Sequence, residues 1–400
     1  MRPYAVFLIV AGCTAFGSSC AYTLNLVFQI GVVGLDPLGL VLVGTVLEVV
    51  YLVAQVPMGI LADLRGRRLP VVLGVLLTGA ATVLQGAAPT VPATIAGTAL
   101  FGVGAACFDG AFEAWAADEL GEAGIGAALV RGAQLAQAAS IAGMLAASAL
   151  SAADPSLPLL AGGAVWLALG LLLLPAMRAR PAPRGRPEDL LAGLRAANRA
   201  PRVRAMAFAT LFVALGREGF DRLGQAHLLD ALPGAGASAS LWLGGLAITT
   251  TLAAIPLTRL LGNLLPGDGP AFAWLLSAQV AAMAVFALAD RFALAAAAAV
   301  VAGALRSAAD PLWTAWLVAR TAPATRATVL SAIGMLSATG EIAGGPPAGW
   351  IGRRFSVARA LLACAAVTLP GVVFLKRAGA PRDRRRGGAD AEREPARSGD

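Results

Sequence analysis

The chain has 400 residues, of which 58% are hydrophobic and only 14% are charged, and its mean hydropathy is +0.74. Soluble domains have roughly 45–50% apolar and about 25% charged residues, so this chain lacks the polar side chains needed to cover a water-soluble fold of its size. The net charge of +8 does not indicate nucleic-acid binding, because the arginines gather in short segments between apolar runs, as membrane orientation requires. The composition predicts an integral membrane protein.

Apolar runs long enough to cross a bilayer follow one another along the chain. A bilayer core about 30 Å thick takes around 20 apolar residues in a helix. In chain order the predicted spans are 5–30, 38–61, 70–88, 92–115, 132–152, 158–177, 205–230, 239–260, 270–289, 292–318, 328–348 and 356–375. The predicted fold class is therefore an all-α integral membrane protein of about twelve transmembrane helices.

A polar gap divides these spans into two groups of six. Residues 178–186 are rich in Arg and Pro, and residues 187–199 have the pattern of a short amphipathic helix on the membrane surface. The charged segment that follows the last span is expected to be disordered. The predicted domains are a six-helix bundle at 1–177, a cytoplasmic linker at 178–204, a second six-helix bundle at 205–376 and a cytoplasmic tail at 377–400.

The distribution of arginines predicts the orientation, because cytoplasmic loops carry an excess of Lys and Arg. With both termini in the cytoplasm of a bacterial cell, the inner segments hold the arginines of 65–68, eight in 178–204 and those of the tail. The outer loops then hold Arg291, Arg353, Arg354 and Arg359. The loop before the last span violates the rule, and the sequence offers no physical reason for its three arginines.

The fourth and tenth spans resemble each other. Laying Phe108–Trp115 on Ala309–Trp316 brings Asp109 onto Asp310, and the same offset brings Gly102 onto Gly303. Charge inside a membrane is rare and costly, so an aligned aspartate indicates an internal repeat. Secondary transporters use such parallel repeats, with the substrate site between the halves.

The segment Gly59–Arg68, between the second and third spans, reads Gly-Ile-Leu-Ala-Asp-Leu-Arg-Gly-Arg-Arg. It resembles the signature of the major facilitator superfamily at this loop, and the resemblance extends over essentially residues 1–376. The matching residues are Gly59, Asp63, Gly66, Arg67 and Arg68, while Arg65 comes one position later than the usual arginine. The resemblance implies a transporter of two six-helix bundles in which these residues gate the cytoplasmic side.

Each residue of this motif has a physical interpretation. Gly59 allows helices to approach closely, and Gly66 permits a tight turn. Asp63 can face the positive N-terminus of the eleventh span near Ala327, and Arg67 can meet Asp118 or Glu119. The alternative is that the three arginines only enforce topology.

The resemblance leaves the direction of transport open. Residues Gly110–Trp115 and Phe220–Leu223 loosely resemble segments of tetracycline-type exporters, which favours efflux. Drug–proton antiporters often carry an arginine in the fourth helix, where this chain has Thr98, and their fifth-helix motif is absent from 132–152.

Ionisable side chains at membrane depth are candidates for proton coupling or substrate binding. In the second half most of these side chains have a partner of opposite charge four residues away on the same helix. Such pairs are explained equally well by mutual neutralisation of charge inside the membrane and by a functional role. The expected pairs are Arg217 with Asp221, Glu218 with Arg222, and Arg306 with Asp310.

The acids of the first half have no basic neighbour at helical spacing. Glu113 lies near the interface, where water or Arg131 can satisfy it, whereas Glu48 and Asp109 lie deeper. We expect Asp109, with Glu48 or with Glu341 of the eleventh span, to take up a proton in one conformation and to pair with a second-half arginine in the other. A permanently protonated or permanently paired acid is the alternative.

The leading functional prediction is proton-coupled efflux of small amphipathic compounds by a monomeric protein. Proton-coupled uptake of a nutrient or metabolite is a second possibility, and a non-transporting sensor or assembly partner is a third. With one His and no Cys/His cluster or glycine-rich phosphate loop, the chain offers little for catalysis. We expect no enzyme activity, no cofactor and no metal site.

Overall fold

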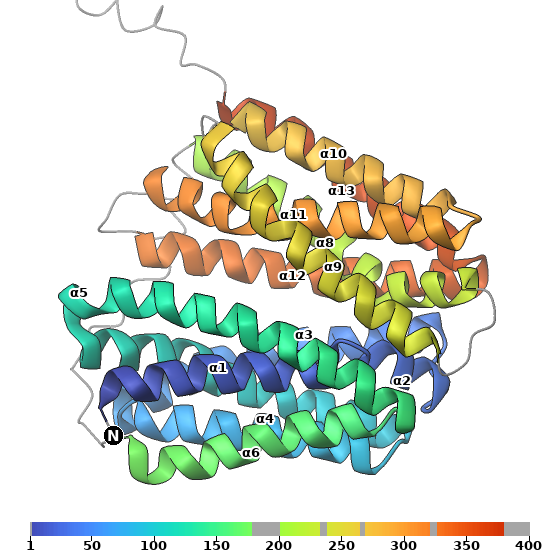
Figure 1. The fold of residues 1–400 in the computed structure, drawn as a ribbon. Coiled ribbons are helices and arrows are strands. Elements are labelled where there is room, and N and C mark those ends of the chain that lie inside the picture. Colours follow the sequence, from blue (N-terminus) through green and yellow to red (C-terminus); the bar gives the residue numbers. More distant parts are fainter. Residues whose placement is uncertain (1, 178–200, 233–237, 265–268, 321–325, 380–400) are drawn as a thin grey trace, which may run out of the picture.

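A computed structural model describes residues 2–177, 201–232, 238–264, 269–320 and 326–379 (Figure 1). All regular structure within these residues is helical. The first half contains α1 (Pro3–Tyr22), α2 (Asn25–Gly31), α3 (Pro37–Arg65), α4 (Arg68–Ala87), α5 (Val91–Ala153) and α6 (Leu157–Ala176). The second half contains α8 (Pro201–Ala231), α9 (Ser238–Leu264), α10 (Gly269–Leu288), α11 (Phe292–Arg320), α12 (Arg326–Arg354) and α13 (Val357–Gly379).

The predicted spans are helical, although the first is interrupted at Thr23 and Leu24 between α1 and α2, and some boundaries differ from the sequence prediction. Element α5 contains the fourth and fifth spans as two helices, Val91–Gly121 and Gly124–Ala153, that meet at a sharp turn. Gly121 at this turn has a φ of 65°, a conformation that favours glycine. Helix α8 begins at Pro201 rather than at 205. The predicted amphipathic helix at 187–199 and nearly all of the predicted tail lie outside the described residues.

Two helices differ from the rest in polarity. Ten of the described segments are long and apolar enough to cross a membrane, and α8 and α12 are not among them. These two helices carry charged residues within their spans, such as Arg217 and Asp221 in α8 and Glu341 in α12. They pack on each other and both contact α3 of the first half. The polar helices therefore lie where the two halves meet, away from most of the lipid.

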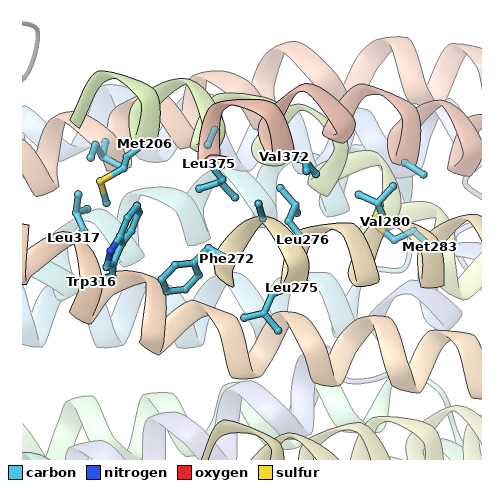
Figure 2. Packing of buried hydrophobic residues seen from close by; sticks show 14 of the residues in the cluster. Met206, Phe272, Leu275, Leu276, Val280, Met283, Trp316, Leu317, Val372 and Leu375 are labelled. Atoms are coloured by element: carbon cyan, nitrogen blue, oxygen red, sulfur yellow. The ribbon is translucent and has the colours of Figure 1, made fainter. Parts of the chain in front are cut away.

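Each half has a buried apolar cluster of its own. In the second half α8, α10, α11 and α13 contribute Met206, Phe272, Leu276, Trp316 and Leu375 (Figure 2). In the first half the corresponding cluster joins α1, α4, α5 and α6. A third buried cluster joins the halves and includes Leu24 and Val41 of the first half with Leu223 and Leu243 of the second. The two clusters inside the halves allow each half to keep its internal packing while it moves relative to the other.

The internal repeat predicted from Asp109 and Asp310 agrees with the helix packing. A Cβ atom at Gly102 of α5 would lie 3.1 Å from the Leu47 carbonyl oxygen of α3, and one at Gly303 of α11 would lie 2.7 Å from Thr250 Cγ2 of α9. The two glycines thus permit the same close approach in the two halves, between the fourth and second spans and between the tenth and eighth spans.

Candidate functional site between the halves

The surface on which the halves meet is here called the seam. Helices α3 and α5 form its first-half side, and α8, α9 and α12 form its second-half side (Figure 1). One end of the bundle holds Asp36 and the turn between α12 and α13, and is called the Asp36 end. The opposite end holds the loop between α3 and α4 and is called the Arg67 end.

Glycines of α12 close the seam at the Asp36 end. A Cβ atom at Gly345 would lie 2.9 Å from Val41 Cγ1 of α3, and one at Gly349 would lie 3.1 Å from Leu38 Cα. Farther along, a Cβ at Gly352 would lie 3.1 Å from Pro37 Cβ. Small residues at these positions let the two backbones approach closely, as is common where helices pack in membranes.

Polar contacts cross the seam at the same end. Arg353 Nε lies 3.3 Å from Asp36 Oδ2, while the other carboxylate oxygen of Asp36 caps α3 by accepting from the Gly39 N–H at 2.7 Å. Between α5 and α9, the hydroxyls of Ser151 and Ser240 are hydrogen-bonded at 2.9 Å. The pair with Asp36 gives a physical reason for Arg353, one of the three arginines of the loop before the last span that the sequence left unexplained.

Toward the Arg67 end the seam is open. Cβ atoms at Gly59 of α3 and at Gly334 of α12 would have no atom within 4 Å. Val53 and Val56 of α3 are 69% and 61% exposed. The predicted close approach at Gly59 is therefore not made in this conformation, which is closed at the Asp36 end only.

The motif loop at the Arg67 end contains one of the predicted contacts. Arg67 Nε lies 3.2 Å from Asp118 Oδ2, as expected, and Arg68 donates to the carbonyl oxygen of Leu174. Gly66 has a φ of 80°, which confirms the predicted tight turn. Arg65 is exposed. The side chains of Asp63 and Ala327 lie outside the described part of the chain, so the proposed contact between Asp63 and the eleventh span stays a prediction.

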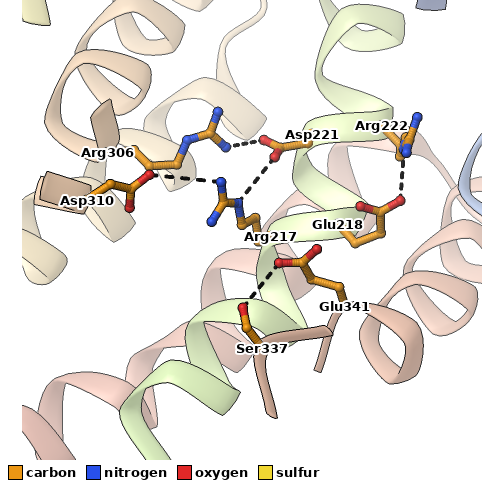
Figure 3. Close-up of polar contacts among 8 residues, drawn as sticks. All are labelled: Arg217, Glu218, Asp221, Arg222, Arg306, Asp310, Ser337 and Glu341. Carbon is orange, nitrogen blue, oxygen red and sulfur yellow. Dashed lines mark hydrogen bonds and ion pairs between the residues drawn. The ribbon is translucent and has the colours of Figure 1, made fainter. Parts of the chain in front are cut away.

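Arginines of the second half are engaged with acids (Figure 3). Arg222 Nε lies 2.8 Å from Glu218 Oε1, and Arg217 Nε lies 3.7 Å from Asp221 Oδ2, which confirms two predicted pairs. The predicted pair of Arg306 with Asp310 is wrong. Arg306 donates to Asp221 of α8, and Asp310 Oδ2 lies 3.9 Å from Arg217 Nη2 instead, because charged groups of the neighbouring helix compete with the partner four residues away.

Three first-half acids at membrane depth have no such partner among the described residues. Among the described residues no arginine lies within ion-pair distance of Glu48, Asp109 or Glu113. Asp109 Oδ2 accepts a hydrogen bond from the hydroxyl of Tyr51 at 2.9 Å. Both Asp109 and Glu113 are exposed in this open conformation, so the first half presents uncompensated carboxylates to the seam.

Glu341 lies at the level of α12 where the seam begins to open, one turn from Gly345. Its carboxylate accepts from the hydroxyl of Ser337 at 3.3 Å (Figure 3), and it is close enough to Glu48 for their charges to interact. Acids from both halves thus converge near the middle of the seam.

A cavity of about 540 Å³ lies beside the ionic network of the second half. Its lining includes Arg217 and Arg306 together with the aromatic side chains of Phe220, Phe272 and Trp313. A second cavity of about 480 Å³, in the first half, is lined by Asp109, Phe101, Phe108 and Trp166 among others. Apolar walls with a few convergent polar groups are typical of sites for small molecules.

Two parts of this site were missed by the sequence analysis. Tyr51 lies in a span of ordinary apolar composition, and only its contact with Asp109 distinguishes it. The second part is the segment Gly349–Arg354, where Gly349, Gly352 and Arg353 help to close the seam. The spacing of Gly345, Gly349 and Gly352 along one helix face was the signal available in the sequence.

We expect Gly349→Val to disfavour this conformation, because its side chain would collide with the backbone of α3 at Leu38. In a cysteine-free background, spin labels at the exposed residues Val32 and Leu241, at the Asp36 end of the two halves, should show a longer distance by pulsed electron paramagnetic resonance. Gly334→Val is the matched control on the same helix, and it should leave the distance unchanged because its Cβ meets nothing within 4 Å. Equal distances in all three proteins would contradict the role of the glycines.

Comparisons with known proteins agree with this architecture. A family model described as Major Facilitator Superfamily matches residues 7–217, more than half of the chain. The structure of the nucleoside transporter NupG has a TM-score of 0.75 at 16% identity, covering 94% of this chain and 99% of that chain. A bacterial homologue of the human lysosomal transporter Spinster, in an inward-facing and unoccupied conformation, has a TM-score of 0.68 at 18% identity, covering 95% and 96% of the two chains.

A third similar structure is a variant of the E. coli fucose:proton symporter FucP, with a TM-score of 0.61 at 15% identity, covering 95% of this chain and 99% of that chain. At such identities the similarity shows the fold alone. No curated protein matches the sequence significantly.

Proposed function

This chain belongs to the major facilitator superfamily of membrane transporters, and we propose that it moves a small solute across the bilayer by alternating access. In this proposal the two halves rock about the seam, so that the acids and arginines between them face one side of the membrane and then the other. The closure at the Asp36 end, together with the open seam at the Arg67 end, supports a conformation open to one side only.

The side to which it opens follows from the arginine distribution. The excess of arginines near residues 65–68 and 178–204 favours a cytoplasmic location for the Arg67 end. The conformation is then open to the cytoplasm and closed to the outside, in a bacterial cell membrane.

The proposal of proton coupling rests on a difference in charge pairing between the two sides of the seam. Arg217, Arg222 and Arg306 of the second half have acid partners. Among the described residues, Glu48, Asp109 and Glu113 of the first half have no arginine within ion-pair distance. A carboxylate that faces the open seam without a counter-charge can bind a proton there. When the seam closes at the Arg67 end, Asp109 approaches the second-half arginines and releases the proton.

The aromatic lining of the cavity beside Arg217 and Arg306 supports an amphipathic solute, and the loose resemblance to tetracycline-type exporters favours efflux. Uptake of a nutrient or metabolite with protons is the alternative direction, and the similarity of fold to a fucose:proton symporter is compatible with it. A protein without transport activity, acting as a sensor or assembly partner, is a third candidate.

Flux in membrane vesicles separates these functions. We expect inside-out vesicles from cells that overproduce the protein to accumulate amphipathic compounds when respiration acidifies their lumen, because efflux from a cell corresponds to uptake into such vesicles. A protonophore should abolish the accumulation.

The control is a vesicle preparation from cells without the protein. Accumulation that occurs only in right-side-out vesicles would overturn efflux in favour of uptake. Flux with no response to the protonophore would overturn proton coupling, and absence of flux across a broad solute panel would favour the third candidate.

A further inference from the structure

The turn between α12 and α13 carries more positive charge than its surroundings neutralise. It holds three arginines, Arg353, Arg354 and Arg359, at the end of the bundle that the positive-inside rule would leave poor in arginine. Arg353 is paired with Asp36. Among the described residues, Arg354 and Arg359 have no carboxylate within ion-pair distance, so two guanidinium groups lack a counter-charge.

These two guanidinium groups are held around one aromatic ring. The central guanidinium carbon (Cζ) of Arg354 lies 5.6 Å from the centroid of the Phe355 ring, and that of Arg359 lies 5.9 Å from it. The Trp350 ring meets the Phe355 ring edge-on, with centroids 5.8 Å apart. Contacts of this kind with an aromatic face hold the cations in place before any ligand arrives.

The backbone adds to the positive potential. Helix α13 begins at Val357, and the Ser356 hydroxyl oxygen accepts from the N–H of Arg359 at 3.2 Å. Arg359 therefore lies in the first turn of a helix, where the helix dipole favours anions over cations. The helix dipole therefore adds to the positive potential of the arginines in this turn, and an anion placed here would be stabilised by both.

The neighbouring rings indicate where that anion comes from. Trp350 and Phe355 are 55% and 53% exposed, and they lie where the apolar span Val357–Arg377 begins. Exposed aromatic side chains at the end of a membrane span lie at the level of the lipid headgroups. A lipid phosphate reaches this level together with apolar chains that cover the rings, which a free ion does not do.

We infer that Trp350, Arg354, Phe355 and Arg359 form a binding site for the phosphate group of an anionic phospholipid. The two guanidinium groups contact the phosphate, and the two rings contact the glycerol and upper acyl region. The net charge of the site selects an anionic lipid, because the cationic ammonium group of a zwitterionic headgroup already neutralises its phosphate. This inference does not depend on transport or on the identity of the solute.

Native mass spectrometry of the full chain, released from nanodiscs with equal amounts of phosphatidylglycerol and phosphatidylcholine, tests the site. We expect phosphatidylglycerol to be retained in preference. In the double variant Arg354→Gln, Arg359→Gln its apparent affinity should fall by at least about tenfold, since two charge-assisted contacts are lost. The matched control is Arg291→Gln, an exposed arginine in another loop at the same end, which should retain the lipid.

Three outcomes would overturn the site: equal retention of the two lipids, unchanged retention in the double variant, or displacement of the lipid by inorganic phosphate alone. A second double variant, Arg354→Lys with Arg359→Lys, keeps the charge and guards against misfolding. It should retain the preference for phosphatidylglycerol more strongly than the glutamine variant, and no difference between the two would also contradict the inference.

Discussion

Asp109→Asn should reduce proton-driven transport to the level of vesicles that lack the protein. Asparagine keeps the size of the side chain and its ability to accept from the Tyr51 hydroxyl, 2.9 Å away in the native protein, but it cannot bind and release a proton. The variant should remain folded, because Asp109 is exposed to the seam. Proton-linked accumulation in energised vesicles and solute exchange without a proton gradient are the two measurements.

The internal repeat supplies the matched control for this prediction. Asp310 occupies the equivalent place in α11, but it lies 3.9 Å from Arg217, which has Asp221 as a second partner. We therefore expect Asp310→Asn to lower transport by only a few fold, since surface-accessible pairs contribute about 0–1 kcal/mol. If Asp109→Asn transports with normal proton dependence, or if the two variants behave alike, the proposed role of Asp109 fails.

Arg222→Met should produce the largest loss of stability among single changes at the seam. Glu218 is only 6% exposed, so its carboxylate has little access to water. Its Oε1 atom lies against Gly44 of the opposite half, where a Cβ atom would collide with it. Removal of one partner from a buried ion pair costs about 3–5 kcal/mol, because the remaining charge stays buried. Thermal unfolding in detergent should show a markedly lower midpoint.

Two further variants identify the cause of that loss. The double variant Arg222→Met, Glu218→Gln should recover most of the stability, because it removes the isolated charge. Arg353→Met breaks an exposed pair across the same seam, with side chains 62% and 47% exposed, and it should cost at most about 1 kcal/mol. The explanation by an isolated buried charge would be wrong if Arg222→Met had the midpoint of the native protein, or if the double variant did not recover stability.

Features set by residues close in the sequence were predictable. Apolar runs give the spans directly because lipid requires about 20 apolar residues per helix. The turn at Gly66 and the pairs Arg217–Asp221 and Glu218–Arg222 also depend only on local geometry, and the structure contains them. The contact of Arg67 with Asp118 joins residues far apart in the sequence, and it was predictable because both lie in loops at the same end of the bundle.

Features that depend on helix rotation were not predictable from one sequence. The contact of Tyr51 with Asp109 and the choice of Asp221 by Arg306 require the relative rotation of neighbouring helices. Gly59 illustrates a different limit, since its predicted close contact depends on which end of the seam is closed. In alternating access the same sequence adopts the conformation closed at the Asp36 end and the one closed at the Arg67 end. A sequence motif therefore does not predict which of the two a structure contains.

The length of the helices at the seam has a consequence for the size of the motion. Helices α3 and α12 each contain 29 residues, which corresponds to about 43 Å at 1.5 Å per residue. Gly349, at the contact between the two helices, lies about 35 Å from the start of α12 at this rise. A tilt of only about 10° around this contact therefore shifts the far end of α12 by roughly 6 Å relative to α3. A passage wide enough for a small molecule can thus open by a slight pivot at the Gly345–Gly352 contact, with the side-chain packing inside each half left as it was.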